Sequence, residues 1–363
     1  MITEYVNQFD RRPLRPLRPV RWADGGAVLM DQRRLPHEEV YLHFSTSEEV
    51  AQGIRDMVVR GAPAIGLAAA YGAVLAAAET DTIVADRSPQ RWLEQFRQAL
   101  RPLAEARPTA VNLGWALAQM DQAAQRLLMA ADQAPVAELK QLADELVTED
   151  LAEGEQMAEF GAGLIEPGSV VLTHCNAGAL ATGGVGTAVG VINAAWRQGR
   201  IDRVYASETR PWLQGSRLTA WELQQQGIDP CVLVEGAVGA LLRDRGVSWL
   251  IVGADRIAVN GDVANKIGTY GAALLARQHG VKVMVVAPTS TIDPALASGD
   301  EIEIEQRGSD EITEIGGVRV AADGVEVWNP VFDVTPAQLV DFIVTEKGVV
   351  KTPSTVAIQS LLA

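Results

Sequence analysis

Two reactive side chains each come directly after a short apolar segment that is typical of a buried strand. Cys175 follows the segment 170–173 and His174, and Asp255 follows the segment 250–254. A thiol beside the start of a helix is favoured as the thiolate, and a carboxyl group at the end of an apolar strand is partly removed from water, as a general acid or base requires. The two positions therefore indicate nucleophilic or acid–base chemistry.

Each of these residues also has a purely structural interpretation, which the residues alone leave open. Cys175 can be a small buried side chain that only packs, and Asp255 can be a loop residue or a helix cap. His174 alternates with Cys175 and is expected to face the opposite way, so the two should not form a local catalytic pair. Cys231 begins an apolar strand and is expected to pack.

Cationic residues stand where helices are expected to start. Arg60 and Arg107 each precede a segment in which Gly or Pro interrupts the helical pattern before a new helix. Asn265 and Lys266 are expected at the beginning of a helix that runs to His279, where side-chain and backbone donors together suit a phosphate group. A single arginine or lysine is more often a solvated surface charge, but two arginines at interrupted helix starts suggest a two-part anion clamp.

The sequence predicts no metal and no organic cofactor. Gly183, Gly184 and Gly186 suggest a dinucleotide-binding loop, but that fingerprint requires its first glycine directly after the strand, and these glycines come well after it. There is also no C-x-x-C pair, no H-E-x-x-H segment and no Walker loop. Nicotinamide or flavin binding is therefore not expected.

The rhythm of apolar residues changes near residue 150. Residues 27–35 alternate apolar and polar side chains after a turn at 24–26, which predicts a small antiparallel hairpin. Residues 46–147 follow a helical pattern. Beyond residue 168, short apolar runs alternate with helical stretches, which is typical of a doubly wound parallel α/β sheet that is covered by helices on both faces.

Length and charge limit the classes of function. The 363 residues exceed one typical core, so we expect two domains, a helical one over 1–148 and an α/β one over 149–363. The net charge of −15 would repel phosphate backbones, which argues against a nucleic acid partner. The acidic stretch 300–326, with nine carboxylates and two arginines, is expected to be solvated surface.

We also expect no membrane partner and a cytoplasmic location. No apolar run approaches the roughly 20 residues that a membrane helix needs. The first residues lack the basic-then-apolar order of a signal peptide.

Six segments, in order along nearly the whole chain, carry a resemblance to one family. They are RGAPAIG at 60–66, RPTAVNL at 107–113, THCNAGALAT at 173–182, ETRPWLQGSRLTAWEL at 208–223, GADRIAVNGDVANKIGTY at 253–270 and NPVFDVTPAQL at 329–339. These segments resemble the methylthioribose-1-phosphate isomerases of the methionine salvage pathway. The same superfamily contains ribose-1,5-bisphosphate isomerases and the regulatory subunits of the eukaryotic guanine-nucleotide exchange factor for translation initiation.

The resemblance implies a helical N-terminal domain, a Rossmann-like C-terminal domain, a homodimer and a sugar phosphate as the partner. It implies isomerisation of 5-methylthio-α-D-ribose 1-phosphate to 5-methylthio-D-ribulose 1-phosphate. In this family the aspartate of the GADR segment, here Asp255, donates a proton to the ring oxygen. The cysteine of the THCN segment, here Cys175, stabilises the transition state or shares in proton transfer. The residues implied to bind substrate are Arg60, Gly61, Ala62, Arg107, Gln214, Asn265 and Lys266.

Two other functions in the superfamily remain as alternatives. One is an isomerase of ribose 1,5-bisphosphate, in which a second phosphate replaces the methylthio group. The other is a non-catalytic regulatory subunit, against which the presence of both Cys175 and Asp255 argues.

Overall fold

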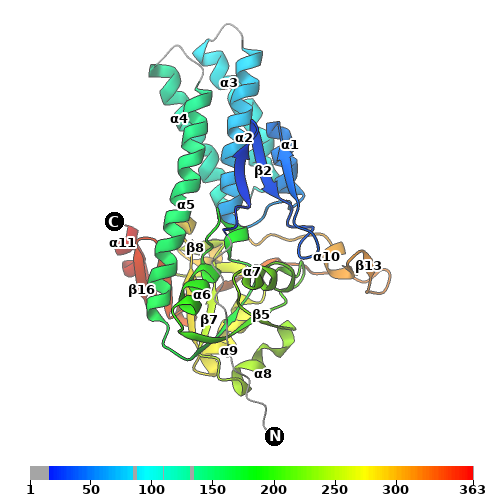
Figure 1. Ribbon diagram of the computed structural model, residues 1–363, viewed down its shortest axis with the longest axis vertical. Helices are drawn as coiled ribbons and strands as arrows, with labels where there is room; N and C mark the ends of the chain where they lie inside the picture. The colour runs from blue at the N-terminus through cyan, green and yellow to red at the C-terminus, as the bar shows by residue number, and fades with distance from the viewer. Residues whose placement is uncertain (1–15, 85–87, 109, 131–134, 363) are drawn as a thin grey trace.

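The chain folds into a helical half that stands on an α/β half (Figure 1). The computed structural model describes residues 16–84, 88–108, 110–130 and 135–362, so Thr109 of the RPTAVNL segment lies outside the described residues. The helical region comes first along the chain and the α/β region follows it, as the sequence predicted. The predicted fold class is therefore confirmed.

A small antiparallel sheet opens the described chain. Its strands are β1 Val20–Ala23, β2 Gly26–Met30 and β3 Tyr41–Phe44, in the order β1-β2-β3. Asp24 and Gly25 both have positive φ, 51° and 78°, which is the geometry of a two-residue hairpin turn that matches the twist of the strands. The predicted hairpin is present, and β3 adds a third strand that the alternation did not indicate.

The predicted helical region forms a bundle. Its helices are α1 Ser47–Arg55, α2 Ala62–Ile83, α3 Pro89–Ala106, α4 Val111–Ala130 and α5 Val136–Leu164. Thr46 caps α1, because its side chain accepts the N–H of Glu49 while the Glu49 carboxylate accepts the N–H of Thr46. Pro89 begins α3. Proline has no backbone N–H, and at the first position of a helix this costs nothing, because an N–H there would have no partner within the helix.

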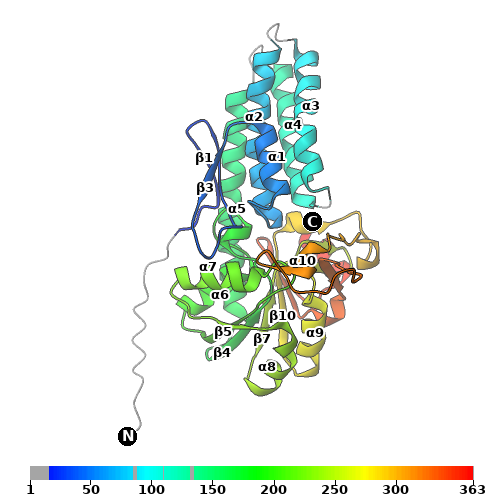
Figure 2. The same cartoon turned by 90° about the vertical axis from the view of Figure 1, so that its right-hand side faces the viewer.

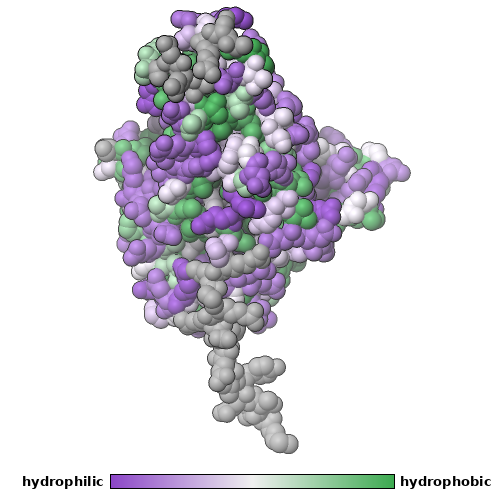
Figure 3. All heavy atoms as spheres, turned by 45° about the horizontal axis from the view of Figure 1, so that its top comes forward, coloured by the Kyte–Doolittle hydropathy of each residue, from purple (hydrophilic) through white to green (hydrophobic). Residues whose placement is uncertain are grey.

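Helix α2 is the core of this bundle. Among the described residues it is the one helix long and apolar enough to cross a membrane, so the expectation that no apolar run approaches that length was wrong. However, 83% of its most apolar window is buried inside the protein, which is the character of a core helix. The face in Figure 3 is covered mostly by hydrophilic side chains, with smaller apolar areas between them.

Helix α5 runs from the bundle down the side of the α/β half (Figure 1). It packs against α2 in the bundle and against α6 (Ala188–Arg197) in the α/β half. The predicted domain boundary at residue 148 lies within this helix. One continuous helix therefore connects the two halves.

The α/β half is built on a seven-stranded sheet in the order β16-β15-β10-β7-β4-β5-β6. All neighbouring strands are parallel except β16, which pairs antiparallel with β15. The strands are β4 Ser169–Thr173, β5 Ile201–Ser207, β6 Cys231–Leu233, β7 Trp249–Val252, β10 Lys282–Val286, β15 Phe342–Thr345 and β16 Gly348–Lys351. The first six strands in sequence follow the 3-2-1-4-5-6 order of the doubly wound fold.

Helices cover both faces of this sheet, as Figure 2 shows for α6 on one side and α9 on the other. Leu250 and Val252 of β7 belong to the cluster that includes α9, whereas Trp249 and Ile251 belong to the cluster that includes α6. This alternation explains why the strands are apolar without interruption. The remaining helices of this half are α7 Ala220–Gln225, α8 Val238–Asp244, α9 Thr269–Gln278, α10 Asp310–Thr313 and α11 Thr355–Leu362.

A second, four-stranded sheet lies beside the strand ends, in the order β11-β8-β9-β14. Its strands are β8 Arg256–Ala258, β9 Val263–Lys266, β11 Ile292–Asp293 and β14 Phe332–Thr335, and a separate hairpin pairs β12 Glu314–Ile315 with β13 Val318–Arg319. Asn265 and Lys266 therefore lie on a strand, and the prediction that they begin a helix was wrong, since α9 starts at Thr269. A turn with Gly261 at φ 89° folds β9 back onto β8, and this short hairpin has no long apolar run to reveal it.

Two glycines of α5 test how closely this helix has to approach α6. A Cβ added at Gly161 would lie 2.5 Å from Cγ2 of Val191, whereas a Cβ at Gly163 would meet nothing within 4 Å. We expect Gly161→Ala to lower the free energy of unfolding by about 1–3 kcal/mol, because overpacking forces the helices apart. The matched control Gly163→Ala should raise it by up to about 1 kcal/mol. Equal effects of the two substitutions in thermal or denaturant unfolding would contradict the close approach.

Candidate active site

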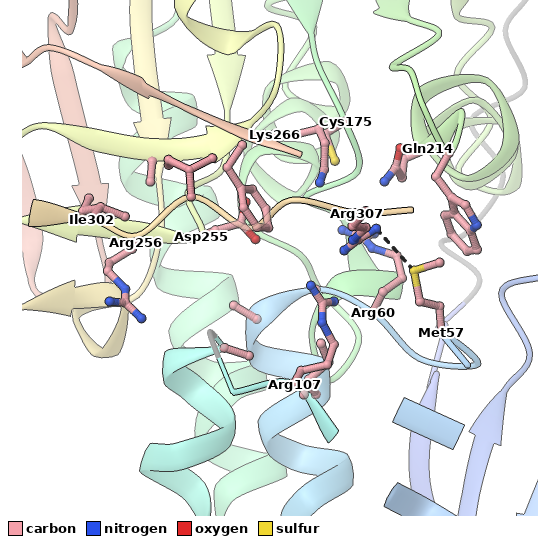
Figure 4. A pocket seen from close by; sticks show the side chains of 18 of the residues that line it. Met57, Arg60, Arg107, Cys175, Gln214, Asp255, Arg256, Lys266, Ile302 and Arg307 are labelled. Atoms are coloured by element: carbon pink, nitrogen blue, oxygen red, sulfur yellow. Dashed lines mark hydrogen bonds between the residues drawn. The ribbon is translucent and has the colours of Figure 1, made fainter. Parts of the chain in front are cut away.

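A cavity that is open to solvent lies where the bundle meets the strand ends (Figure 4). The predicted site residues that line it are Arg60, Gly61, Ala62, Arg107, Cys175, Gln214, Asp255 and Lys266. Asn265 lines a smaller, adjoining cavity, which Cys175 and Asp255 also line. The structure thus gathers all of the predicted residues around two adjoining cavities.

The strand order explains why Cys175 and Asp255 meet. The chain leaves β4 toward β5 on one side and leaves β7 toward β10 on the other, although β4 and β7 are neighbours. Such a reversal opens a crevice at the carboxyl ends of the two strands. Cys175 follows β4 and Asp255 follows β7, so both side chains come to that crevice.

The backbone of Cys175 is held in an uncommon conformation. Its φ is 63°, a left-handed value that costs a residue other than glycine of order 1–3 kcal/mol. The N–H of Cys175 donates to Oγ1 of Thr209 at 2.8 Å, and its carbonyl accepts the hydroxyl of Thr219 at 2.5 Å. These two threonines fix the loop that presents the thiol to the cavity.

The environment of Cys175 keeps the thiol protonated. Burial raises the pKa of Cys175, and the nearby cations Arg60 and Lys266 only oppose this effect. The expectation that a helix start favours the thiolate was wrong, because the residues after Cys175 form only the short turn Ala179–Ala181 (η1). The first α-helix that the structure describes after it, α6, begins at Ala188.

Asp255 lies at the junction of the two sheets. Its N–H donates to the carbonyl of Ala264 on β9 at 2.9 Å, directly before β8 begins. The side chain is half-buried and lines both cavities. A carboxyl group in this position can exchange a proton with a bound molecule.

Lys266 is a buried cation in the wall of the cavity. Its Nζ donates to the carbonyl of Val331 at 2.8 Å and lies 4.1 Å from the centre of the Phe332 ring. Burial lowers the pKa of Lys266 to about 8, although the nearby carboxylate of Asp255 acts in the opposite direction. Its neighbour on β9, Asn265, donates from Nδ2 to Oγ1 of Thr269 at 3.0 Å.

Arg60 reaches the α/β half from the start of α2. Its guanidinium donates to Oδ1 of Asn176 at 2.7 Å and to the carbonyl of Asn176 at 2.8 Å. Gly61 has a φ of 97°, and a Cβ there would lie 2.5 Å from that of Ala181. The first turn of α2 therefore lies directly against the loop that follows β4.

Gln214 offers an unused acceptor. The residue is 3% exposed, and its Oε1 has no hydrogen-bond partner among the residues that the structure describes. Leaving a buried amide oxygen unpaired costs about 1–3 kcal/mol. A hydroxyl of a bound molecule would supply the missing donor.

Glu305 bridges two arginines at the cavity. Arg107 donates to Oε2 of Glu305 at 3.0 Å, and Arg307 donates to Oε1 at 2.7 Å. Burial alone would raise the pKa of Glu305, but the two guanidiniums lower it to about 2. Glu305 and Arg307 belong to the acidic stretch that we expected to be solvated surface, and for these two residues that expectation was wrong.

The lining also contains large apolar residues. They are Met57, Ile65, Trp212, Ile302 and Phe332. Trp212 lies two positions before Gln214 in the RPWLQG segment, but nothing in the sequence placed Met57 or Ile302 near a site. His174 lines only the smaller cavity, with Nδ1 2.6 Å from Oγ of Ser207 and Nε2 2.8 Å from the carbonyl of Ile267. Burial lowers the pKa of His174 to about 4.

Metal ligands are not clustered in the described part of the chain. Within it, no group of three or more His, Cys, Asp or Glu side chains could hold an ion. The cavity is lined by cations, by the thiol of Cys175 and by the carboxyl groups of Asp255 and Glu303, and it lies at the switch point of a doubly wound sheet. This combination defines a site for a small anionic molecule that also undergoes proton transfer.

Comparison with known proteins identifies the family. The Initiation factor 2 subunit family matches residues 58–352. The methylthioribose-1-phosphate isomerase of Xanthomonas campestris pv. campestris (strain B100) is 53% identical over 344 residues, which cover 95% of each chain. The protein of the same name from Pseudomonas syringae pv. syringae (strain B728a) is 53% identical over 351 residues, which cover 96% of each chain. The chain belongs to the Initiation factor 2 subunit family.

Solved structures show the same fold. The crystal structure of 5-methylthioribose 1-phosphate isomerase from Pyrococcus horikoshii OT3 matches with a TM-score of 0.85 and 39% identity, over 98% of this chain and 99% of that one. A structure described as translation initiation factor eIF-2B, subunit delta, from A. fulgidus matches with a TM-score of 0.82 and 40% identity, over 95% and 99% of the two chains. The same fold therefore occurs both in a protein described as an isomerase and in one described as a translation initiation factor subunit, so the fold alone does not distinguish these two functions.

The Glu305 bridge generates a prediction about stability and pH. The pKa of Glu305 is about 2 in the folded protein, compared with an ordinary value of 4.5. The bridge therefore stabilises the fold fully above about pH 4.5 and loses this contribution as the pH falls toward 2. We expect Glu305→Gln to lower the free energy of unfolding by about 1–3 kcal/mol at pH 7.

Thermal unfolding of wild type and variant between pH 3 and 7 measures this difference. The matched control is Glu303→Gln, an exposed residue two positions away. A deficit that stays constant over this pH range would show that the ion pairs with Arg107 and Arg307 are not its cause.

Proposed function

We propose that this protein is a methylthioribose-1-phosphate isomerase, which converts 5-methylthio-α-D-ribose 1-phosphate to 5-methylthio-D-ribulose 1-phosphate. The relatives that are 53% identical over nearly the whole chain carry that name. The observation that carries the proposal is the meeting of Asp255 and Cys175 with the cations Arg60, Arg107 and Lys266 in one cavity. The same residues were expected to form the site from the sequence.

Asp255 is proposed as the proton donor that opens the sugar ring. The anomeric oxygen of the substrate carries the phosphate, so the sugar cannot open spontaneously to a free aldehyde. The bond between C1 and the ring oxygen breaks when that oxygen receives a proton. Asp255 is half-buried between the two sheets, where a bound sugar would exclude water from its carboxyl group.

The cations of the cavity are proposed to hold the phosphate at C1. Lys266 is buried in the wall of the cavity, and Arg60 is fixed by Asn176. Arg107 is engaged by Glu305, and a phosphate would compete with that carboxylate for the guanidinium. The remaining apolar lining, with Met57 and Trp212, suits a thioether, because sulfur makes favourable contacts with aromatic rings.

Cys175 is proposed to act after the ring has opened. The hydrogen on C2 has to reach C1, and the proton of the 2-hydroxyl has to leave, to give a ketone at C2 and a methylene group at C1. Because burial raises the pKa of Cys175, the neutral thiol is the resting form. It either takes part in this proton transfer or stabilises the transition state by donating a hydrogen bond. Deuterium from solvent in the C1 methylene group would distinguish an enediolate route from a direct hydride shift.

The homodimer and the cytoplasmic location stay predictions. Two-fold dimers are the commonest soluble oligomers. Exposed apolar side chains on β6 and α9 provide area that a second copy would cover, namely Val232, Tyr270, Leu274 and Leu275.

Purified protein should convert the methylthio sugar phosphate to the ketose. We expect Asp255→Asn and Cys175→Ala each to lower kcat/KM by about 100-fold or more, since each removes a proton-transfer or charge-stabilising group. Cys231→Ser is the matched control, because Cys231 lies on β6 outside the cavity and should be replaceable. Full activity of either cavity variant would contradict its proposed role. A higher kcat/KM for ribose 1,5-bisphosphate would favour the alternative isomerase, and no turnover at all would favour a regulatory subunit.

The pH dependence of substrate binding should report Lys266. Its pKa is lowered by burial to about 8, so its charge is lost as the pH rises through that value. We expect kcat/KM to fall above about pH 8, because an uncharged lysine no longer attracts the phosphate. Lys266→Arg should remove this fall, since arginine stays charged. A pH profile above 8 that is identical in the two proteins would rule out Lys266 as its origin.

A further inference from the structure

A fully buried carboxylate lies behind the cavity, and the proposed mechanism does not use it. Glu222 is the third residue of α7 and is 0% exposed. It lines neither of the two cavities at the site. A buried carboxylate is costly unless donors surround it, so its contacts should have a purpose.

The carboxylate of Glu222 accepts hydrogen bonds from the loop that carries Cys175. Its Oε1 accepts the N–H of Ala179 at 2.6 Å, and its Oε2 accepts the N–H of Leu180 at 3.3 Å. Oε2 also accepts from Nδ2 of Asn176 at 3.2 Å. A Cβ added at Gly178 would lie 2.0 Å from the carboxylate, so the loop passes directly against it.

Asn176 transmits this contact to a cation of the cavity. Its Nδ2 donates to Glu222, while its Oδ1 accepts from Arg60 at 2.7 Å and its carbonyl accepts from Arg60 at 2.8 Å. Asn176 is 2% exposed and Arg60 is 9% exposed, so little water screens the chain of contacts. The negative charge of Glu222 therefore polarises the amide that holds the guanidinium.

A residue at the start of α7 makes a further hydrogen bond to the same loop. Thr219, three residues before Glu222, donates its hydroxyl to the carbonyl of Cys175. The left-handed backbone of Cys175 is thus fixed from the helix that supplies the carboxylate. Burial raises the pKa of Glu222, while the three N–H donors and the nearby Arg60 oppose that rise by favouring the ionised form.

We propose that Glu222 is a positioning residue for the isomerase reaction, which acts through Asn176 to fix Arg60 for binding the substrate phosphate. The proposal rests on the proposed function. Arg60 contacts phosphate in the ground state and the transition state alike, so its displacement should raise KM more than it lowers kcat. Glu222 touches neither the substrate nor the reacting atoms.

The first test is Glu222→Gln, which keeps the shape of the side chain and removes its charge. We expect KM to rise about tenfold, with a smaller change in kcat, and the dissociation constant of inorganic phosphate to rise in parallel. Asn176→Ala interrupts the chain at its middle while Glu222 keeps its bonds to Ala179 and Leu180, so it should produce the same rise if Glu222→Gln fails to fold. A folded Glu222→Gln or Asn176→Ala protein with wild-type KM and phosphate affinity would overturn the proposal.

The second test moves the negative charge from position 222 to position 176. In Glu222→Gln combined with Asn176→Asp, the new carboxylate would accept directly from Arg60, and the new amide would donate to that carboxylate. We expect this double variant to bind phosphate within about threefold of wild type. A double variant no better than Glu222→Gln would show that loop packing, and not the charge, is what Glu222 supplies.

A control separates positioning from stability. Glu79 in α2 accepts the N–H and the hydroxyl of Ser47, both at 2.9 Å, far from Arg60 in the bundle. Glu79→Gln should lower the melting temperature without changing KM. Phosphate affinity by calorimetry also keeps the two proposals distinguishable, since it tests Glu222 even if wild type turns over no sugar phosphate.

Discussion

The contact between Gly61 and Ala181 is the constraint on which the site depends. The two residues come so close that no Cβ fits at Gly61, and Gly61 has a backbone angle that only glycine adopts easily. The first turn of α2 can therefore lie against the loop after β4. This contact brings Arg60 within reach of Asn176 and places the bundle over the thiol of Cys175.

Helix α5 also fixes the position of the bundle relative to the α/β half, because it packs against helices of both. It packs on α2 in the bundle and on α6 beside the sheet, and it continues without a break through the point where the sequence predicted a domain boundary. The cations of the cavity come from both halves, Arg60 and Arg107 from one, and Arg256, Lys266 and Arg307 from the other. Their spacing is therefore set by helix packing, and not by a flexible linker.

Much of the site could be predicted because it follows the strands of a parallel sheet. Cys175 and Asp255 come directly after apolar runs, and the rule for carboxyl ends of strands places such residues together. The hairpin β8–β9 could not be predicted, since its strands are too short to show a period, and Lys266 was therefore assigned to a helix. Glu305 and Arg307 were missed because an acidic stretch gives no sign of which carboxylate will turn inward to meet Arg107.

The position of Glu222 also concerns the loop that binds a dinucleotide in other proteins with this fold. In doubly wound proteins, the loop after the first strand of the 3-2-1-4-5-6 order offers its backbone amides to the pyrophosphate of a dinucleotide. Here that first strand is β4, and the amides of Ala179 and Leu180 in the loop already donate to the carboxylate of Glu222. The protein thus supplies its own internal anion where a nucleotide-binding relative of the fold would hold a cofactor, and the crevice beside it remains open to a sugar.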